Sequence, residues 1–205
     1  MNLVKYKMSE EVCLQCLVVS FRSGRWEEWF SNPTAGPWKK VRIEGVGDED
    51  QIRFEKEQDR PDLVVADRKS GLVIMLEAKD SIGSLLETAQ IRKSIGVFAS
   101  GFVRLDSILA RHGSRLFAGT EPKLICGYLF PTASQTDILE LNRLHMQEAN
   151  RIKNSRLQPH VVFEVKRASN DDLRLAYRLY DSSQTVSALL GKVLPNTITP
   201  TRQAT

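Results

Sequence analysis

The sequence has no hydrophobic run that approaches the roughly 18 residues needed for a membrane-spanning helix. Its first residues, Met1 to Ser9, also lack the apolar core of a signal peptide. These two absences argue against a membrane-embedded or exported protein, and we expect an intracellular one. Internal repeats and long low-complexity segments are absent too, so a repeat architecture is not expected.

Cysteine is scarce, and its odd count raises no pairing problem in a reducing compartment. Cys13 and Cys16 form a C-x-x-C, which could be half of a zinc site or a redox pair, but a second pair at ligand spacing is missing. The neighbouring residues are apolar, and we therefore predict a buried helix face in which cysteine acts as a small hydrophobe. The three histidines also lack metal-ligand spacing, and we expect surface or core positions for His112, His145 and His160.

The bulk composition is that of a soluble globular chain. With 205 residues and 41% hydrophobic content, the chain can bury one substantial core, and we expect a single domain over 1–205. The net charge of +4 is mildly basic and compatible with a polyanionic partner such as nucleic acid.

The hydrophobic periodicity predicts an α/β fold, a mixed sheet flanked by helices. Residues 26–30 are expected to add a helical turn, and 47–60 to form a loop or an exposed hairpin. Helices are predicted at 9–21, from 82 onward, and at 102–112, 132–154 and 171–180. Strands are predicted at 38–46, 62–66, 72–78, 123–130 and 160–166.

The most informative stretch carries charged residues at the ends of two apolar strands. Asp62 opens the first strand, Glu77 closes the second, and Lys79 follows two residues later on the same side. Both strands are apolar almost throughout, which indicates that both faces of the sheet are covered. If the strands are neighbours, two carboxylates and one ammonium converge. Such a group suits a divalent metal and phosphodiester hydrolysis.

These residues resemble the signature of the PD-(D/E)XK nuclease superfamily, with Pro61-Asp62 followed by Glu77-Ala78-Lys79. The order of helix, three strands, helix and strand over about 9–130 also resembles the restriction-endonuclease-like core. The resemblance implies a Mg²⁺-dependent DNA endonuclease, closest to a site-specific type II restriction enzyme of a restriction-modification system. It further implies double-stranded DNA as partner, a homodimer, a prokaryotic cytoplasm, and a role in dimerisation or DNA recognition for 132–205.

In this interpretation the metal is bound by side chains that supply hard oxygen ligands. Asp62 and Glu77 would each give a carboxylate oxygen, and the resemblance adds the backbone carbonyl of Ala78. Lys79 would stabilise negative charge that develops during hydrolysis. Mn²⁺ is expected to substitute for Mg²⁺. The structural alternative is that Asp62 caps a turn while Glu77 and Lys79 form an ion pair at a sheet edge.

Many members of the superfamily add an acidic residue from the first helix. Glu11 is our choice because it shares a face with Leu14, although a solvated position in the first turn is an alternative. Gln90 could assist from the helix that follows the lysine, or could be an exposed helix residue. The rivals of Glu11 are Glu10, Glu27 and Glu28.

DNA contacts are expected from basic residues, although a solvated helix face explains the larger cluster equally well. Two further functions stay open: a repair, recombination or transposition nuclease, and an inert DNA-binding module. The larger cluster comprises Arg92, Lys93, Arg104, Arg111 and Arg115. A smaller cluster beside Trp38 comprises Lys39, Lys40 and Arg42.

Overall fold

The computed structural model describes residues 9–22, 26–31, 41–54, 60–158, 160–167 and 173–180. Six strands in these ranges form one sheet, in which the spatial order follows the order of the chain. The strands are β1 (Glu27–Ser31), β2 (Leu63–Asp67), β3 (Leu72–Ala78), β4 (Lys123–Pro131), β5 (His160–Arg167) and β6 (Leu173–Tyr180). β1, β2 and β3 are antiparallel neighbours, β3, β4 and β5 are parallel, and β6 is antiparallel to β5. The expected α/β class with a mixed sheet is confirmed.

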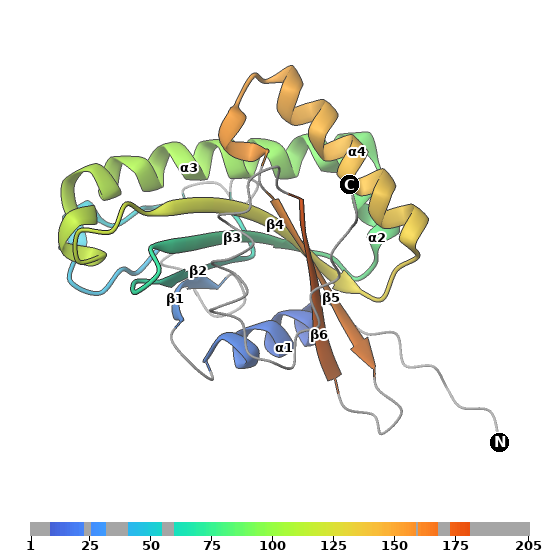
Figure 1. Ribbon diagram of the computed structural model, residues 1–205, viewed down its shortest axis with the longest axis horizontal. Helices are drawn as coiled ribbons and strands as arrows, with labels where there is room; N and C mark the ends of the chain where they lie inside the picture. The colour runs from blue at the N-terminus through green and yellow to red at the C-terminus, as the bar shows by residue number, and fades with distance from the viewer. Residues whose placement is uncertain are drawn as a thin grey trace.

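Helices cover both faces of the sheet (Figure 1). They are α1 (Glu10–Arg22), α2 (Ile82–Leu85), α3 (Thr88–Leu116) and α4 (Gln135–Arg151), with short 3₁₀ turns η2 (Asp48–Asp50) and η4 (Ser155–Leu157). α3 connects β3 to β4 and α4 connects β4 to β5, so both crossovers move in the same direction across the sheet. Because such connections are right-handed, both helices lie on one face, and α1 lies on the other.

The two central strands are buried on both sides, as their uninterrupted apolar sequences predict. Every residue of β2 and β3 is buried. Alternate residues face two separate clusters: Val64 and Met75 pack with α3, whereas Val65 and Ile74 pack with α1. The tight reversal expected between these strands is also present, and Gly71 adopts a φ of 71° there.

α3 is a single helix of 29 residues, where we expected separate segments from 82 onward and at 102–112. Its buried face includes Ile91, Phe98 and Leu105, which recur at helical spacing. Gly101 allows the helix to pack closely on β3, because a Cβ at this position would collide with the side chain of Met75. α3 therefore lies over β3, the strand that carries Glu77.

α1 covers the opposite face of the sheet, and it matches the helix predicted at 9–21 with its cysteines on the buried face. Its first turn is capped by Ser9, whose Oγ accepts a hydrogen bond of 3.3 Å from the backbone N–H of Val12. Cys13 is fully buried, and Cys16 packs partly buried against the same cluster. Burial raises the pKa of Cys13 to about 12, so this thiol stays protonated and acts as a small hydrophobe.

Three local predictions were wrong. Residues 27–31 form β1 instead of a helical turn, because they pair antiparallel with β2 along its edge. Residues 41–46 are not a strand; 38–40 lie outside the described residues. The predicted helix at 171–180 is largely β6, whose apolar residues alternate with period two and pair along the free edge of β5.

The C-terminal part of the chain continues the sheet. α4, β5 and β6 belong to the segment 132–205 that we expected to extend the core, and they extend the sheet beyond β4. The predicted inward residues of α4 are buried: Ile138, Leu141 and Leu144. Within the described residues, none of the helices combines the length and the apolar composition that a membrane span requires.

Candidate functional site

The antiparallel pairing of β2 and β3 brings the start of one strand to the end of the other. Asp62, directly before β2, donates its backbone N–H to the carbonyl of Leu76 over 2.9 Å. Its side-chain Oδ2 accepts a hydrogen bond of 2.7 Å from the backbone N–H of Ala78. The expectation that the two apolar strands are neighbours, with Asp62 beside the end of the second, is therefore confirmed.

Lys79 lies at the centre of a group that we call the carboxylate–lysine cluster, formed by Glu10, Asp62, Glu77 and Lys79. Its Nζ is 3.6 Å from Oε2 of Glu77, 3.7 Å from Oδ2 of Asp62 and 4.0 Å from Oε2 of Glu10. The same ammonium donates a hydrogen bond of 2.6 Å to the carbonyl of Ala78. Because β3 lies between β2 and β4, this ion pair is not at a sheet edge.

The cluster holds more negative charge than its one ammonium balances. Asp62 is 7% exposed and Glu77 is 5% exposed. Burial, followed by the nearby charge of Asp62, raises the pKa of Glu77 to about 8. Burial alone would lower the pKa of Lys79, but the carboxylates of Asp62, Glu77 and Glu10 outweigh it and hold that pKa above its usual value. The folded chain thus carries a buried carboxyl that favours a further positive charge.

These residues fit a hard divalent cation. Two buried carboxylates and the Ala78 carbonyl offer the oxygen ligands that Mg²⁺ prefers, and the raised pKa of Glu77 reflects charge that such an ion would balance. In the part of the chain that the structure describes, no three His, Cys, Asp or Glu side chains are grouped to hold a metal by themselves. Bound water would complete the coordination, as is usual for Mg²⁺.

The helix acid beside the lysine is Glu10, not Glu11. Glu11 is exposed and accepts a hydrogen bond of 3.5 Å from Nε2 of Gln15. The expectation that it points inward was wrong, because Glu10 stands three and four residues before the buried Cys13 and Leu14. That spacing places Glu10 on their face of the helix. The same spacing in the sequence could have identified it.

The other acidic rivals lie away from the cluster. Glu27 pairs with Ala66 in the sheet register, near the far end of β2, and its Oε1 is 2.8 Å from Nε of Arg68. Glu28 pairs with Val65 in the same register. Gln90 is half-buried on α3, without a hydrogen bond to any residue that the structure describes.

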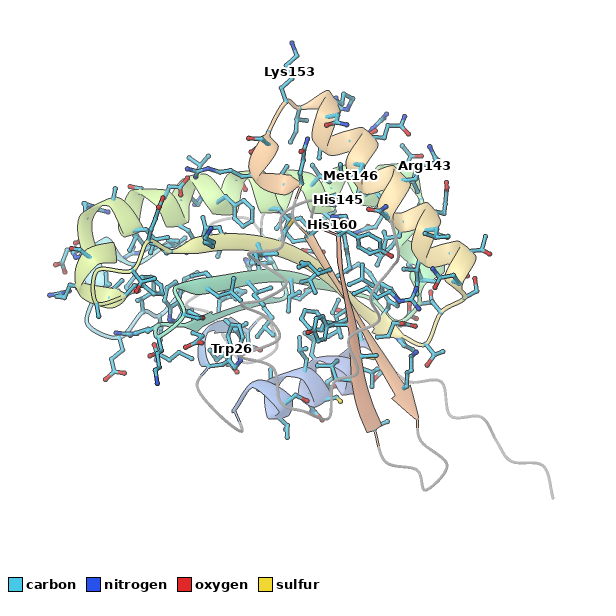
Figure 2. All side chains as sticks on the ribbon, viewed as in Figure 1. Trp26, Arg143, His145, Met146, Lys153 and His160 are labelled. Carbon is cyan, nitrogen blue, oxygen red and sulfur yellow. The ribbon has the colours of Figure 1, made fainter. Side chains whose placement is uncertain are left out.

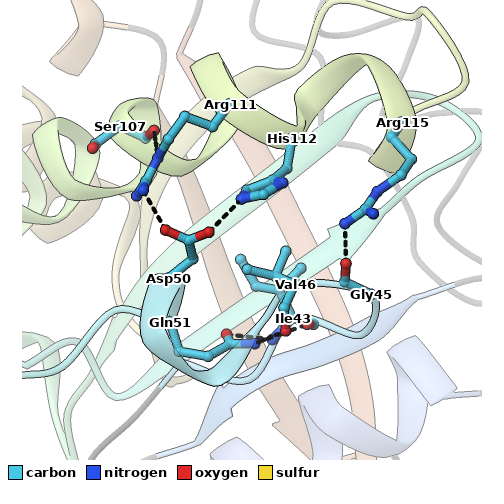
Figure 3. A network of polar contacts seen from close by, with 9 residues as sticks. All are labelled: Ile43, Gly45, Val46, Asp50, Gln51, Ser107, Arg111, His112 and Arg115. Carbon is cyan, nitrogen blue, oxygen red and sulfur yellow. Dashed lines mark hydrogen bonds and ion pairs between the residues drawn. The ribbon is translucent and has the colours of Figure 1, made fainter.

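Most of the basic residues on α3 hold other parts of the chain. Arg111 and His112 both contact Asp50, and Arg115 donates to the carbonyl of Gly45 (Figure 3). Arg104 donates to the carbonyl of Arg53 and Arg92 pairs with Glu148, so each of these exposed arginines has a partner within the chain. Lys93 differs: it is exposed, and its charge acts to lower the pKa of Glu77. In the smaller cluster Arg42 is exposed, and Lys39 and Lys40 lie outside the described residues.

A second buried polar group, the tyrosine–histidine cluster, lies beside the first and comprises Tyr128, His145 and His160. Tyr128 is the register partner of Glu77 on β4. Its hydroxyl is 2.8 Å from Nδ1 of His145, and the rings of His145 and His160 stack with centroids 3.9 Å apart (Figure 2). No spacing in the sequence indicated this cluster, because the helix α4 and the strand β5 bring its histidines together.

Comparisons of the chain with protein-family models, curated proteins and solved structures found no match. The geometry of the carboxylate–lysine cluster therefore carries the functional argument.

Proposed function

We propose that this protein is a Mg²⁺-dependent DNA endonuclease of the PD-(D/E)XK superfamily with a restriction-endonuclease-like core. The observation that carries the proposal is the convergence of Asp62, Glu77 and Lys79 at one buried end of β2 and β3. Two carboxylates can hold the metal ion in phosphodiester hydrolysis, and an amine beside them can stabilise the negative charge that develops.

The arrangement of the elements supports the same proposal. α1 packs on one face, β1, β2 and β3 form an antiparallel unit, and β4 returns parallel to β3 after α3. This is the order that the resemblance implies, although the first strand comes earlier in the chain than expected. The site also lies at the carboxyl end of β3, where ligands commonly bind to open α/β sheets.

The roles of the side chains follow from their charges. When bound, Mg²⁺ supplies a Lewis acid that polarises a phosphate oxygen and acidifies a water molecule. Asp62, Glu77 and the carbonyl of Ala78 would hold it. Lys79 places a positive charge where a phosphate in the site gains negative charge, and the carboxylates around Lys79 keep its ammonium protonated. Glu10 adds a third carboxylate at 4.0 Å from that ammonium.

Within this chemistry we propose a site-specific, homodimeric type II enzyme acting on double-stranded DNA. A two-fold dimer would cut both strands of a symmetric site. The net charge of +4 is compatible with DNA, and α4, β5 and β6 offer chain beyond the core for recognition.

The test is a plasmid digestion in Mg²⁺ with two matched variants. Wild type should produce discrete bands, and EDTA should stop the reaction. Glu77→Gln should lower the rate by about a thousandfold, because it removes several kcal/mol of charge stabilisation. Glu140→Gln, an exposed residue paired with Arg143 on α4, should cut like wild type.

The digestion also separates the alternatives. A smear would indicate cleavage without site specificity, and preference for branched DNA would indicate a repair or recombination nuclease. DNA binding without cleavage by wild type, in Mg²⁺ and in Mn²⁺, would overturn the endonuclease proposal.

A further inference from the structure

Arg60 carries an unusual side chain two residues before Asp62. Its Nε and Nη2 atoms are shielded from solvent, and neither has a hydrogen-bond partner among the residues that the structure describes. Arginine keeps its proton under all ordinary conditions, so the side chain cannot escape the cost of burial by becoming neutral. Arg60 as a whole is half-buried, but this edge of its guanidinium is shielded and unpartnered within the described residues, and such an edge suits an anionic ligand.

Other arginines of this chain are paired where they approach the interior. Arg68, at the opposite end of β2, places Nε 2.8 Å from Oε1 of Glu27 and donates from Nη2 to the carbonyl of Glu44 over 2.9 Å. Arg178 also has a buried Nε without a partner, but its two Nη atoms reach Gln135 and Glu164. Arg60 lacks such contacts within the described ranges.

The two unpartnered nitrogens are neighbours on one edge of the guanidinium group. This edge forms two parallel N–H···O bonds to a phosphate or a carboxylate. Among the described residues, the carboxylates of the cluster already have partners: Oδ2 of Asp62 accepts from Ala78, and Glu77 lies 3.6 Å from Lys79. An external phosphate is the anion that suits this edge and this location.

Position along the chain places Arg60 beside the carboxylate–lysine cluster. Two residues of extended chain span at most about 7 Å, so its backbone lies within that distance of Asp62. Pro61 stands between them and restricts the preceding backbone to extended conformations. The backbone of Arg60 is thus held near the end of the sheet where the substrate would bind, and its long side chain starts there.

We infer that Arg60 binds a backbone phosphate of the nucleic-acid substrate, next to the phosphate that is hydrolysed. The inference rests on the proposed function, because it assigns a phosphate-binding residue to that same site. Arg60 would position the strand, and the substrate phosphate would pair with the shielded edge of its guanidinium.

The first test uses inorganic phosphate as the probe and thermal unfolding as the readout, so it needs no cleavage. Phosphate should raise the melting temperature of wild type above that in chloride at equal ionic strength. Arg60→Gln should lose this response and be at least as stable as wild type in chloride, because the unpaired charge is gone. Arg60→Lys should recover only part of the response, since an ammonium lacks the two-pronged edge.

Arg68→Gln is the matched control at the other end of β2. It should be less stable than wild type, because it breaks two contacts, and should keep the phosphate response. If Arg60→Gln behaved in the same way, less stable and still responsive to phosphate, Arg60 would be a structural residue and the inference would be overturned.

The second test measures cleavage and binding of DNA. Arg60→Gln should raise KM by about 10- to 100-fold, as expected for a lost hydrogen bond to a charged group, with a smaller change in kcat. The slope of log affinity against log salt should fall by about 1, as for one lost phosphate contact.

The two tests separate the inference from the proposed function. A phosphate response that depends on Arg60 in a wild type that cuts no DNA would support the anion site and overturn the endonuclease proposal. Cleavage by wild type with an unchanged KM, salt slope and phosphate response in Arg60→Gln would overturn only the inference.

Discussion

Two buried polar clusters lie side by side in this molecule, joined through the register pair Glu77 and Tyr128. In the tyrosine–histidine cluster, the Leu157 carbonyl accepts a hydrogen bond from Nε2 of His145 over 2.5 Å. Nδ1 of the same ring therefore accepts from the hydroxyl of Tyr128. Burial lowers the pKa of His145 to about 4 and that of His160 well below its usual value, so the cluster is neutral at pH 7.

The carboxylate–lysine cluster is less completely buried, with a partly exposed Lys79 and Glu10, and is not electrically balanced. Its Glu77 has a pKa raised to about 8 by burial and by Asp62, although Lys79 and Lys93 act in the opposite direction. In the tyrosine–histidine cluster, Tyr128 and His145 form a neutral, hydrogen-bonded pair that stabilises the core without any ligand. Nε2 of His160 is buried without a hydrogen-bond partner among the described residues, but the neutral ring leaves no charge unbalanced. A cluster that holds buried carboxylates at the expense of stability indicates that a ligand completes it.

The difference predicts opposite pH dependences of the free energy of unfolding. Glu77 binds a proton more tightly when folded, so its contribution falls as pH rises from about 4.5 to 8. His145 binds a proton more weakly when folded, so its contribution falls as pH drops from about 6.5 to 4. Stability without metal should therefore decline on both sides of a maximum near pH 6.

Glu77→Gln should remove the alkaline decline alone. At pH 8.5 we expect this variant to melt roughly 5 to 10 °C above wild type, because the cost of burying the ionised carboxyl is gone. Thermal unfolding of both proteins between pH 4 and 9, in EDTA, measures the effect. An alkaline decline that persists in Glu77→Gln would show that the two clusters do not differ in the way described.

A smaller effect is expected from breaking the tyrosine–histidine cluster. Tyr128→Phe removes the donor to Nδ1 of His145 and leaves a buried acceptor unpaired, which should cost about 1 to 3 kcal/mol. Denaturant unfolding at pH 7 measures this loss, while cleavage of DNA should be unchanged. Tyr177→Phe, a buried tyrosine on β6 that packs near Phe163, is the control and should change stability by less than about 0.5 kcal/mol. Reduced cleavage in Tyr128→Phe would place this cluster within the catalytic machinery.

The central part of the fold could be predicted from the sequence because local signals agree with tertiary packing there. The strands that carry Asp62 and Glu77 are bounded by turn residues and buried on both faces, and their pattern is unambiguous. β1 and β6 were mistaken for helical segments because short stretches do not distinguish the two periods, and pairing with β2 and β5 decides their structure.

Some residues of the candidate site could be predicted from the sequence and others could not. Asp62, Glu77 and Lys79 could be found because they are charged residues at the ends of apolar strands. Arg60 could not, because its significance is the absence of a partner within the described residues, and only packing reveals that. The tyrosine–histidine cluster likewise depends on α4 crossing back over the sheet to reach β5.

The smallest predicted effect tests which first-turn acid belongs to the carboxylate–lysine cluster. Glu10 lies 4.0 Å from Nζ of Lys79 and is partly exposed, whereas Glu11 contacts Gln15. Partly exposed ion pairs contribute up to about 1 kcal/mol, so Glu10→Gln should reduce cleavage by roughly 2- to 5-fold. Glu11→Gln, the same change one residue later, should leave cleavage and Mg²⁺ affinity unaltered. Equal effects of the two substitutions would show that both act only through the charge of the helix terminus and that neither belongs to the site.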